Sequence, residues 1–273
     1  MILKAEGTDL ESLLAWLSHE EPLNLPIIGD LMRHGLSTDF LEVWVQPDED
    51  GAIVALVRRF FEHYAVYAVP GADLEEIGFF LRFSDPASVA GRSETIDALV
   101  EALDGYGRED VQSMVLPGAG RLESEPDAVA LAAKGLSIGR AGPDDADALG
   151  GLIFATDAFR HNYRAASEVA AGIRSRMRAG GVRHVVVRQD GRIVSHANTT
   201  AETAGHALLS GITTAPDAQR QGHAARLVSH LCRELLGEGR IPCLFAKSPG
   251  ALAMYEKLGF VKTGVYTTLR RPE

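Results

Sequence analysis

The chain has 273 residues, of which 46% are hydrophobic and 23% are charged. This length suits two packed domains, and this composition excludes a disordered chain, a collagen-like repeat and a coiled coil. The net charge of −10 hides an asymmetry, because residues 1–135 carry 25 acidic and 9 basic side chains whereas residues 136–273 carry 12 and 18. The acidic half would repel nucleic acid, and it either attracts a cationic substrate or only keeps the protein soluble. The basic half suits a small polyanionic ligand.

Targeting features and cysteines indicate the cytoplasm. Charged side chains follow Met1 too early for a signal peptide, since Lys4 and Glu6 are already present. No apolar stretch approaches the roughly 18 residues that a membrane span needs. Cys232 and Cys243 lie in apolar periodic segments, so we expect buried thiols rather than a disulfide framework, a redox pair or a zinc site.

In the first half, predicted helices stand before and after a group of predicted strands. Thr8 is expected to cap the first helix. The helical patterns lie at 10–17, 27–32, 72–82 and 93–103. The β-rich segments lie at 40–46, 52–59 and 61–69, and an apolar run follows at 111–116. Asp50-Gly51 is a hairpin turn between the first two strands.

The second half repeats this order of elements without repeating the residues. Its strands are predicted at 136–140, 184–188, 192–200, 207–214, 241–246 and 263–269, and its helices at 143–154, 165–179, 222–238 and 249–258. Residues 117–126, rich in Gly, Pro and charge, separate the halves. We therefore expect an α+β protein of two similar domains, residues 1–130 and 131–273, each with a mixed, mostly antiparallel sheet flanked by helices.

One segment of the second half has the features of an anion-binding loop. A predicted strand ends at Thr214, and after a turn Gly222 and Ala224 open an amphipathic helix. Small residues let a ligand approach the N–H groups that the first helical turn leaves unpaired, and the helix dipole adds positive potential. Arg220 and Arg226 flank the turn and supply charge for a pyrophosphate. By itself the pattern also fits a purely structural turn, since tight strand-to-helix turns use Gly.

Two motifs in order make the pattern specific. Residues 219–224, Gln-Arg-Gln-Gly-His-Ala, match the Gln/Arg-x-x-Gly-x-Gly/Ala loop of the GNAT acyltransferase superfamily, whose members bind the pyrophosphate of acetyl-CoA there. Residues 255–260, Tyr-Glu-Lys-Leu-Gly-Phe, resemble the second hallmark of that superfamily, near the end of the next helix. The resemblance covers about residues 136–273 and implies tandem GNAT-like domains. Within the superfamily, the chain looks most like the glycine N-acyltransferase-like branch.

The resemblance implies an acyl-CoA site made largely of backbone. It places the pantetheine arm along Ile212, Thr213 and Thr214, and the diphosphate on the amides of Gln221, Gly222, His223, Ala224 and Ala225. The His223 imidazole is expected to face solvent. Superfamily members often have Asn seven residues before the hallmark tyrosine. Here that position is Ser248, which puts one side-chain contact to CoA in doubt. No metal is implied.

For catalysis, the resemblance assigns Tyr255 the protonation of the departing CoA thiolate. Without the motif, Tyr255 would be a half-buried tyrosine that anchors a helix. The oxyanion formed during attack needs a fixed donor, and we expect a backbone N–H near Ile212 or Thr213. An exposed alkylamine has a pKa of about 10.4, so a base or a desolvating pocket must also remove a proton.

Glu202 is the first choice as this base, with a solvated hairpin carboxylate as the equal alternative. His206 and His196 are more often hydrogen-bonded sheet residues than catalytic groups. Residues 159–163, Phe-Arg-His-Asn-Tyr, lie where the superfamily places an acceptor-binding loop, although such a loop is often only packed surface.

The first half offers no comparable loop. Asp73, Glu75 and Glu76 stand where its third strand meets the next helix, and their carboxylates would repel a diphosphate. We therefore expect no CoA binding by this degenerate copy, which would instead cover or shape the acceptor cleft.

The sequence thus predicts a cytoplasmic GNAT-type N-acetyltransferase that moves an acetyl or other short acyl group from CoA to an amine by direct attack in a ternary complex. We favour a small-molecule acceptor, expect neither nucleic acid nor a membrane as partner, and allow for a homodimer. The alternative is a non-catalytic CoA-binding sensor or scaffold protein.

Overall fold

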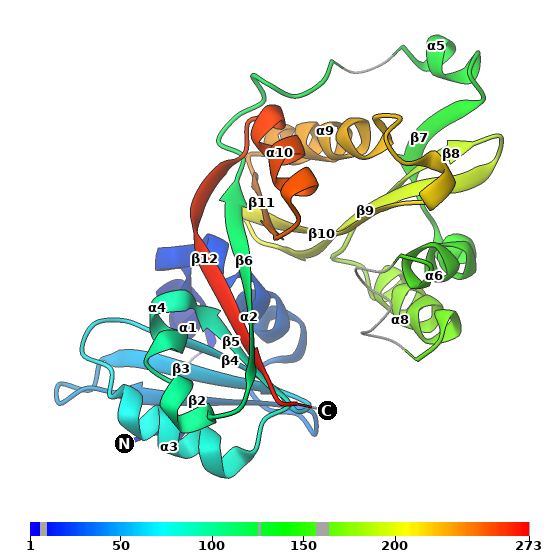
Figure 1. The fold of residues 1–273 in the computed structure, drawn as a ribbon. Coiled ribbons are helices and arrows are strands. Elements are labelled where there is room, and N and C mark those ends of the chain that lie inside the picture. Colours follow the sequence, from blue (N-terminus) through cyan, green and yellow to red (C-terminus); the bar gives the residue numbers. More distant parts are fainter. Residues whose placement is uncertain (6–9, 125–126, 157–163, 273) are drawn as a thin grey trace. The chain divides into compact units, whose positions relative to one another are not determined.

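The chain forms two compact units, whose elements are drawn in Figure 1. The computed structural model describes residues 1–5, 10–124, 127–156 and 164–272, so the Thr8 cap and residues 159–163 lie outside the described part. Unit 1 comprises Met1–Met114, Phe245–Lys247 and Lys262–Glu273, and unit 2 comprises Val115–Leu244 and Ser248–Val261. The expected boundary at residue 130 therefore falls inside unit 2, and the last strand returns to unit 1.

Unit 1 is a sheet covered by helices. Its helices are α1 (Leu10–Leu17), α2 (Glu21–His34), α3 (Leu74–Ser84) and α4 (Ser93–Asp97), with 3-10 turns η1 (Ser18–Glu20) and η2 (Val100–Leu103). Its strands are β1 (Leu3–Lys4), β2 (Leu41–Pro47), β3 (Ile53–Phe60), β4 (His63–Ala68), β5 (Ser88–Arg92), β6 (Gly107–Val115) and β12 (Val261–Arg270). Their order is β1-β2-β3-β4-β5-β12-β6. β1 to β4 pair antiparallel, and β4 pairs with β5 in parallel.

Alternation along the strands of unit 1 divides its core between the two faces of the sheet. Leu56 of β3 packs in a cluster with Leu13 of α1 and Leu31 of α2. Its neighbour Val57 packs in a second cluster with Ile77 of α3. Because successive side chains of a strand point to opposite faces, α1 and α2 cover one face and α3 the other.

Strand β5 is absent from the sequence prediction, because it is short and contains a glycine. An ideal Cβ on Gly91 would lie 2.5 Å from the carbonyl oxygen of Val66. Glycine therefore permits the close parallel pairing of β5 with β4.

The final strand of the chain completes unit 1. β12 pairs antiparallel with β5, with Tyr266 opposite Arg92 and Arg270 opposite Ser88. The expected place of this strand in the second domain is wrong, since strand-forming residues do not specify which sheet they join. Residues 1–114 therefore lack one strand of the unit to which they belong.

Unit 2 repeats the architecture. Its strands are β7 (Leu136–Arg140), β8 (His184–Gln189), β9 (Arg192–Glu202), β10 (His206–Thr214) and β11 (Ile241–Ala246). Its helices are α5 (Ala128–Ala132), α6 (Ala146–Phe154), α8 (Ala166–Ala179), α9 (His223–Gly237) and α10 (Pro249–Leu258), with 3-10 turns η3 (Pro143–Asp145) and η4 (Pro216–Ala218). β7 to β10 pair antiparallel in order, and β10 pairs with β11 in parallel. In Figure 1, α9 and α10 lie on one face of this sheet and α6 and α8 on the other.

The predicted fold class is confirmed. Each unit has antiparallel strands followed by a helical crossover to one parallel strand, which is α3 before β5 in unit 1 and α9 before β11 in unit 2. The protein is therefore a tandem of two similar α+β folds.

Candidate functional site

Strand β10 contains a β-bulge near its carboxyl end. Ser210 pairs with Asn198 and Thr213 pairs with His196, so β10 has one extra residue between these two pairs. Gly211 lies in the bulge with a φ of +57°, a left-handed conformation that glycine adopts without steric penalty. A glycine in the middle of a predicted strand is the sequence signal for such a bulge.

The bulge lies where β10 separates from β11. The parallel ladder between the two strands runs from His206 opposite Ile241 to Leu209 opposite Leu244. β10 then continues to Thr214. Its last residues therefore present an edge beside which an extended chain can be added.

The turn after β10 leads into helix α9 through two left-handed residues. Arg220 has a φ of +62° and Gly222 a φ of +81°. Gly222 is the N-cap of α9 and forms no side-chain capping bond, and the first turn of the helix contains no acidic residue. The N–H groups of that turn and the positive end of the helix dipole are therefore available to an anion.

These elements line one cavity of about 480 Å³. Nine expected site residues line it: Ile212, Thr213, Thr214, Arg220, Gly222, His223, Ala224, Ala225 and Tyr255. The opposite wall comes from helix α10 and includes Gly250 and Met254. The structure thus brings the strand edge, the helix N-terminus and the hallmark tyrosine together around one space.

Tyr255 is buried, with 5% of its surface exposed, and its ring meets Phe260 edge-on at 5.6 Å between centroids. Burial raises the pKa of Tyr255, and the nearby Cys232 adds to the shift. The phenol therefore holds its proton at neutral pH, as a group that donates a proton must.

His223 differs from the expectation that its imidazole faces solvent. The residue is 3% exposed, and its Nε2 has no hydrogen-bond partner within the part of the chain that the structure describes. Burial lowers its pKa, with a smaller contribution from the charge of Arg226. The ring is therefore neutral and packed, which the exposed character of its neighbours in the sequence does not reveal.

Two further residues predicted to bind CoA do not line the cavity. Ser248 is the N-cap of α10, where its hydroxyl accepts a hydrogen bond from the Ala251 N–H at 3.3 Å. The Gln221 side chain donates to the Asp217 carbonyl at 3.4 Å. Both side chains form hydrogen bonds within the protein. Gln221 can therefore contact a ligand through its backbone N–H.

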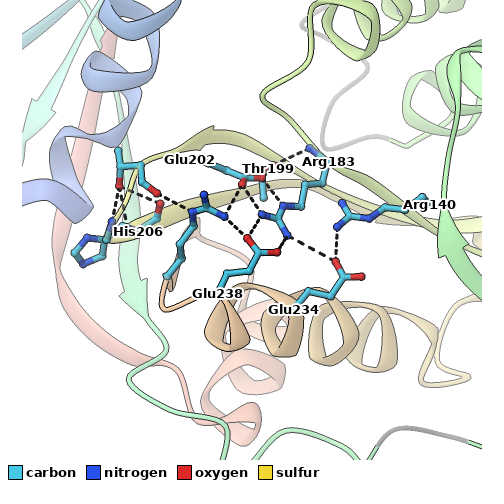
Figure 2. Close-up of polar contacts among 10 residues, drawn as sticks. Arg140, Arg183, Thr199, Glu202, His206, Glu234 and Glu238 are labelled. Carbon is cyan, nitrogen blue, oxygen red and sulfur yellow. Dashed lines mark hydrogen bonds and ion pairs between the residues drawn. The ribbon is translucent and has the colours of Figure 1, made fainter.

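Glu202 lies in an ion-pair network rather than at the cavity. Figure 2 shows the Arg183 guanidinium between the carboxylates of Glu202 and Glu238. Arg183 donates to both oxygens of Glu202 at 2.8 Å, and the Thr199 hydroxyl donates to one of them at 2.6 Å. Arg240 lies 3.6 Å from the same carboxylate. The Glu202 side chain is 11% exposed, and both of its oxygens accept hydrogen bonds from Arg183.

The two candidate histidines also have structural contacts. The backbone N–H of His206 donates to Thr203 Oγ1 at 2.9 Å, which closes the turn between β9 and β10. His196 is fully buried and pairs with His184. Neither lines the cavity.

A larger cavity of about 650 Å³ lies beside α6 and the β8–β9 turn, and none of the predicted site residues lines it. Its charged side chains form ion pairs, with Arg188 2.8 Å from Asp145 and Arg192 2.6 Å from Asp217. We therefore place the candidate site at the smaller cavity, where the unpaired helix N-terminus lies.

Cys232 and Cys243 are both buried, as predicted. Burial raises the pKa of Cys232, which disfavours a reactive thiolate. Among the described residues, no group of three or more His, Cys, Asp or Glu is arranged to hold a metal ion. No described helix is long and apolar enough to cross a bilayer.

Residues 154–268 match the family model described as the acetyltransferase (GNAT) domain. This part of the chain is a GNAT domain. The match includes β10, the loop into α9 and the hallmark tyrosine of α10. No curated protein matches the sequence.

Solved structures extend the likeness over both units. A GCN5-related N-acetyltransferase from Sphaerobacter thermophilus is 16% identical, with a TM-score of 0.66 over 99% of this chain and 96% of its own. One from Kribbella flavida is 17% identical, with a TM-score of 0.64 over 95% of each chain. A tandem GNAT protein from the clavulanic acid biosynthesis pathway is 16% identical, with a TM-score of 0.61 over 100% of this chain and 99% of its own. At this identity the likeness shows the fold alone, a tandem of two GNAT-like folds.

Proposed function

We propose that the protein transfers an acetyl or another short acyl group from CoA to the amine of a small molecule. The observation that carries this proposal is the cavity in which the free edge of β10, the N-terminus of α9 and the buried phenol of Tyr255 converge. These three features correspond to the three parts of acyl-CoA, namely its amide-containing arm, its diphosphate and its sulfur.

The donor is held mainly by backbone. The amides of residues 221–225 bind the diphosphate, and Arg220 lines the same cavity and supplies positive charge. The pantetheine arm lies along Ile212, Thr213 and Thr214, where its amides pair with the strand edge as an added strand would. Gly222 suits this site because it has no side chain to shield the amides and adopts the left-handed φ that the turn requires.

The amine nitrogen attacks the thioester carbonyl carbon, so a C–N bond forms and the carbonyl oxygen becomes an oxyanion. The Ile212 N–H is our candidate donor to this oxyanion, because it lies at the bulge beside the cavity. The C–S bond then breaks, and Tyr255 gives its proton to the CoA sulfur. The proton lost by the amine passes to solvent, from which Tyr255 is reprotonated.

We assign no base role to Glu202, because both of its carboxylate oxygens accept hydrogen bonds from Arg183. The acceptor loses its proton instead when its ammonium leaves water for the cavity, since desolvation lowers the pKa of an amine.

Tyr255→Phe tests the proposal. An enzyme should lose about a hundredfold in kcat, measured by thiol release from acetyl-CoA with a panel of amines, because a general acid contributes about this much or more. The Kd for acetyl-CoA, measured by calorimetry, should stay within about twofold. Tyr106→Phe is the matched control, because it removes a hydroxyl that donates to the Pro86 carbonyl at 2.6 Å in unit 1.

The rival function is a CoA-binding sensor. It would be indicated if the natural protein bound acetyl-CoA, released no thiol with any amine, and lost nothing in Tyr255→Phe. Absence of acetyl-CoA binding would contradict both functions.

A further inference from the structure

Two buried histidines connect the interior of unit 2 to the bulge of β10. His196 of β9 is completely buried, and its Nδ1 lies 3.0 Å from the carbonyl oxygen of Gly211. Its Nε2 lies 3.0 Å from Nδ1 of His184, a residue of β8 that is 4% exposed. The two rings are stacked with 5.2 Å between centroids. A chain of two hydrogen bonds therefore ends on the bulge carbonyl.

The donor and acceptor capacity of each atom determines which ring nitrogens carry hydrogen in this hydrogen-bond chain. The Gly211 carbonyl can only accept, so His196 Nδ1 carries the hydrogen and donates. In a neutral imidazole Nε2 then accepts, so His184 donates from its own Nδ1. Burial lowers the pKa of His196 to about 3 and that of His184 to about 4, so both rings are neutral at physiological pH. The hydrogen-bond directions are therefore the same throughout the pH range of an amine acyltransferase.

The hydrogen bond to Gly211 sets the direction of the next N–H group. The peptide between Gly211 and Ile212 is trans, so its carbonyl and its N–H point in opposite directions. The carbonyl points to His196 on β9. The Ile212 N–H therefore points away from His196. Ile212 lines the cavity and lies beyond the end of the β10 ladder with β11.

We propose that His196 is a positioning residue for acyl transfer, which fixes the Gly211–Ile212 peptide so that the Ile212 N–H donates to the oxyanion, and that His184 holds His196 in place. This inference rests on the proposed function. The two histidines touch no substrate and act through the peptide plane. Pre-orientation matters because a donor that must rotate during the reaction stabilises the oxyanion less.

The surroundings of Gly211 support a peptide held in one orientation. Its φ of +57° is strained for residues with side chains, and an ideal Cβ there would clash with Asn198 Oδ1. The bulge is therefore closely packed by β9, and the bond from His196 fixes its remaining rotation.

His196→Asn and His196→Leu test the proposal, because the asparagine amide can donate from near the place of Nδ1 whereas leucine cannot. Leucine should lower kcat about tenfold to a hundredfold with the KM for acetyl-CoA within about twofold. Asparagine should keep kcat within about threefold of the natural protein. Asn24→Leu is the matched control, since Asn24 is also buried and donates to a backbone carbonyl, that of Leu17 at 2.8 Å in unit 1. The proposal would be overturned if His196→Leu had the same kcat as Asn24→Leu. It would also be overturned if His196→Asn lowered kcat as much as His196→Leu.

If His196→Leu does not fold, His184→Leu is the variant that tests the proposal. It leaves the bond from His196 to Gly211 but removes the donor to His196 Nε2. We expect a kcat about threefold lower at unchanged KM for acetyl-CoA, and an unchanged kcat would overturn the inferred chain.

Crystal structures of the His196 variants separate this inference from the proposed function. The Gly211 carbonyl should turn from its natural orientation in His196→Leu and keep it in His196→Asn. A carbonyl unmoved in both overturns the positioning role even if the natural protein transfers acetyl groups. The opposite outcome is a Gly211 carbonyl that turns only in His196→Leu while the natural protein releases no thiol. It would overturn the proposed function and still support the control of the peptide by His196.

Discussion

Helices α3 and α9 occupy equivalent places in the two units, yet their N-termini are opposites. α3 begins with Asp73, whose carboxylate accepts a hydrogen bond from the Glu76 N–H at 2.9 Å, and two further acids follow in its first turn. α9 begins with Gly222, forms no side-chain cap and has no acid in its first turn. A few residues of a single turn therefore decide whether the helix start in this fold carries carboxylates or uncapped N–H groups.

The start of α3 is also occupied by other groups of unit 1. Gln46 donates to Glu76 at 2.6 Å and accepts from the Asp73 N–H at 2.8 Å. The backbone N–H of Ile2 donates to the same Glu76 carboxylate at 2.8 Å. In unit 1, side chains of the protein thus accept hydrogen bonds from the Asp73 and Glu76 N–H groups at the start of α3.

The two units also differ in the helix that comes after the parallel strand. In unit 2, β11 leads to α10, a helix of 10 residues that carries Tyr255. In unit 1, β5 leads to α4, a helix of five residues, Ser93–Asp97. The described helix α4 contains no tyrosine.

The largest expected effect comes from making the start of α9 resemble that of α3. Gly222→Glu places a carboxylate and a side chain in the left-handed conformation at the proposed diphosphate site. We expect the Kd for acetyl-CoA, measured by calorimetry, to rise by about a hundredfold or more. Gly239→Glu is the matched control, because Gly239 has a φ of +80° and open space around it after the end of α9. A Kd within about threefold of the natural value for Gly222→Glu would contradict the site.

Glu202→Gln tests the ion-pair network around Glu202 and the proposal that this residue is not the base. Removal of a nearly buried carboxylate leaves Arg183 underpaired and should lower the free energy of unfolding by about 2 kcal/mol. The pH profile of kcat should not change. Asp85→Asn breaks an exposed pair with Arg271 and should lower stability by about 0.5 kcal/mol or less in the same urea titration. A shifted pH profile in Glu202→Gln would restore this residue as the base.

Asp73→Ala removes the carboxylate cap of α3. Loss of such a cap should lower the free energy of unfolding by about 1 kcal/mol, measured by urea titration, and Asp73→Asn should keep most of it. Acetyl-CoA should still bind at one site per chain. A second equivalent in Asp73→Ala would show that this carboxylate alone excludes the ligand from unit 1.

The smallest effect concerns the alkaline side of the pH profile. Burial raises the pKa of Tyr255 above the ordinary value of about 10, so the proton-donating form persists as the pH rises. At saturating substrates, kcat should show no decline from Tyr255 ionisation between pH 7 and pH 10. A decline centred below pH 9 that disappears in Tyr255→Phe would contradict this environment.

Local patterns predicted most of the elements and the loop of unit 2. Strand β2, the helix over Leu74–Ser84 and the turn before α9 follow from alternation, helical spacing and glycine placement, which depend on neighbours in the chain. The short strand β5 was not predicted, because one of its five residues is a glycine, which disfavours a strand. That glycine is needed only because β5 packs closely against β4.

The sequence alone determined the tandem order of elements, the acidic start of α3 and the uncapped, small-residue start of α9, because a helix terminus is built from residues adjacent in the chain. Three pairings depend on the three-dimensional fold: β12 with the sheet of unit 1, Arg183 with Glu202, and His196 with the Gly211 carbonyl. These pairings join residues far apart in sequence, and their geometry is set by the packing of the sheets.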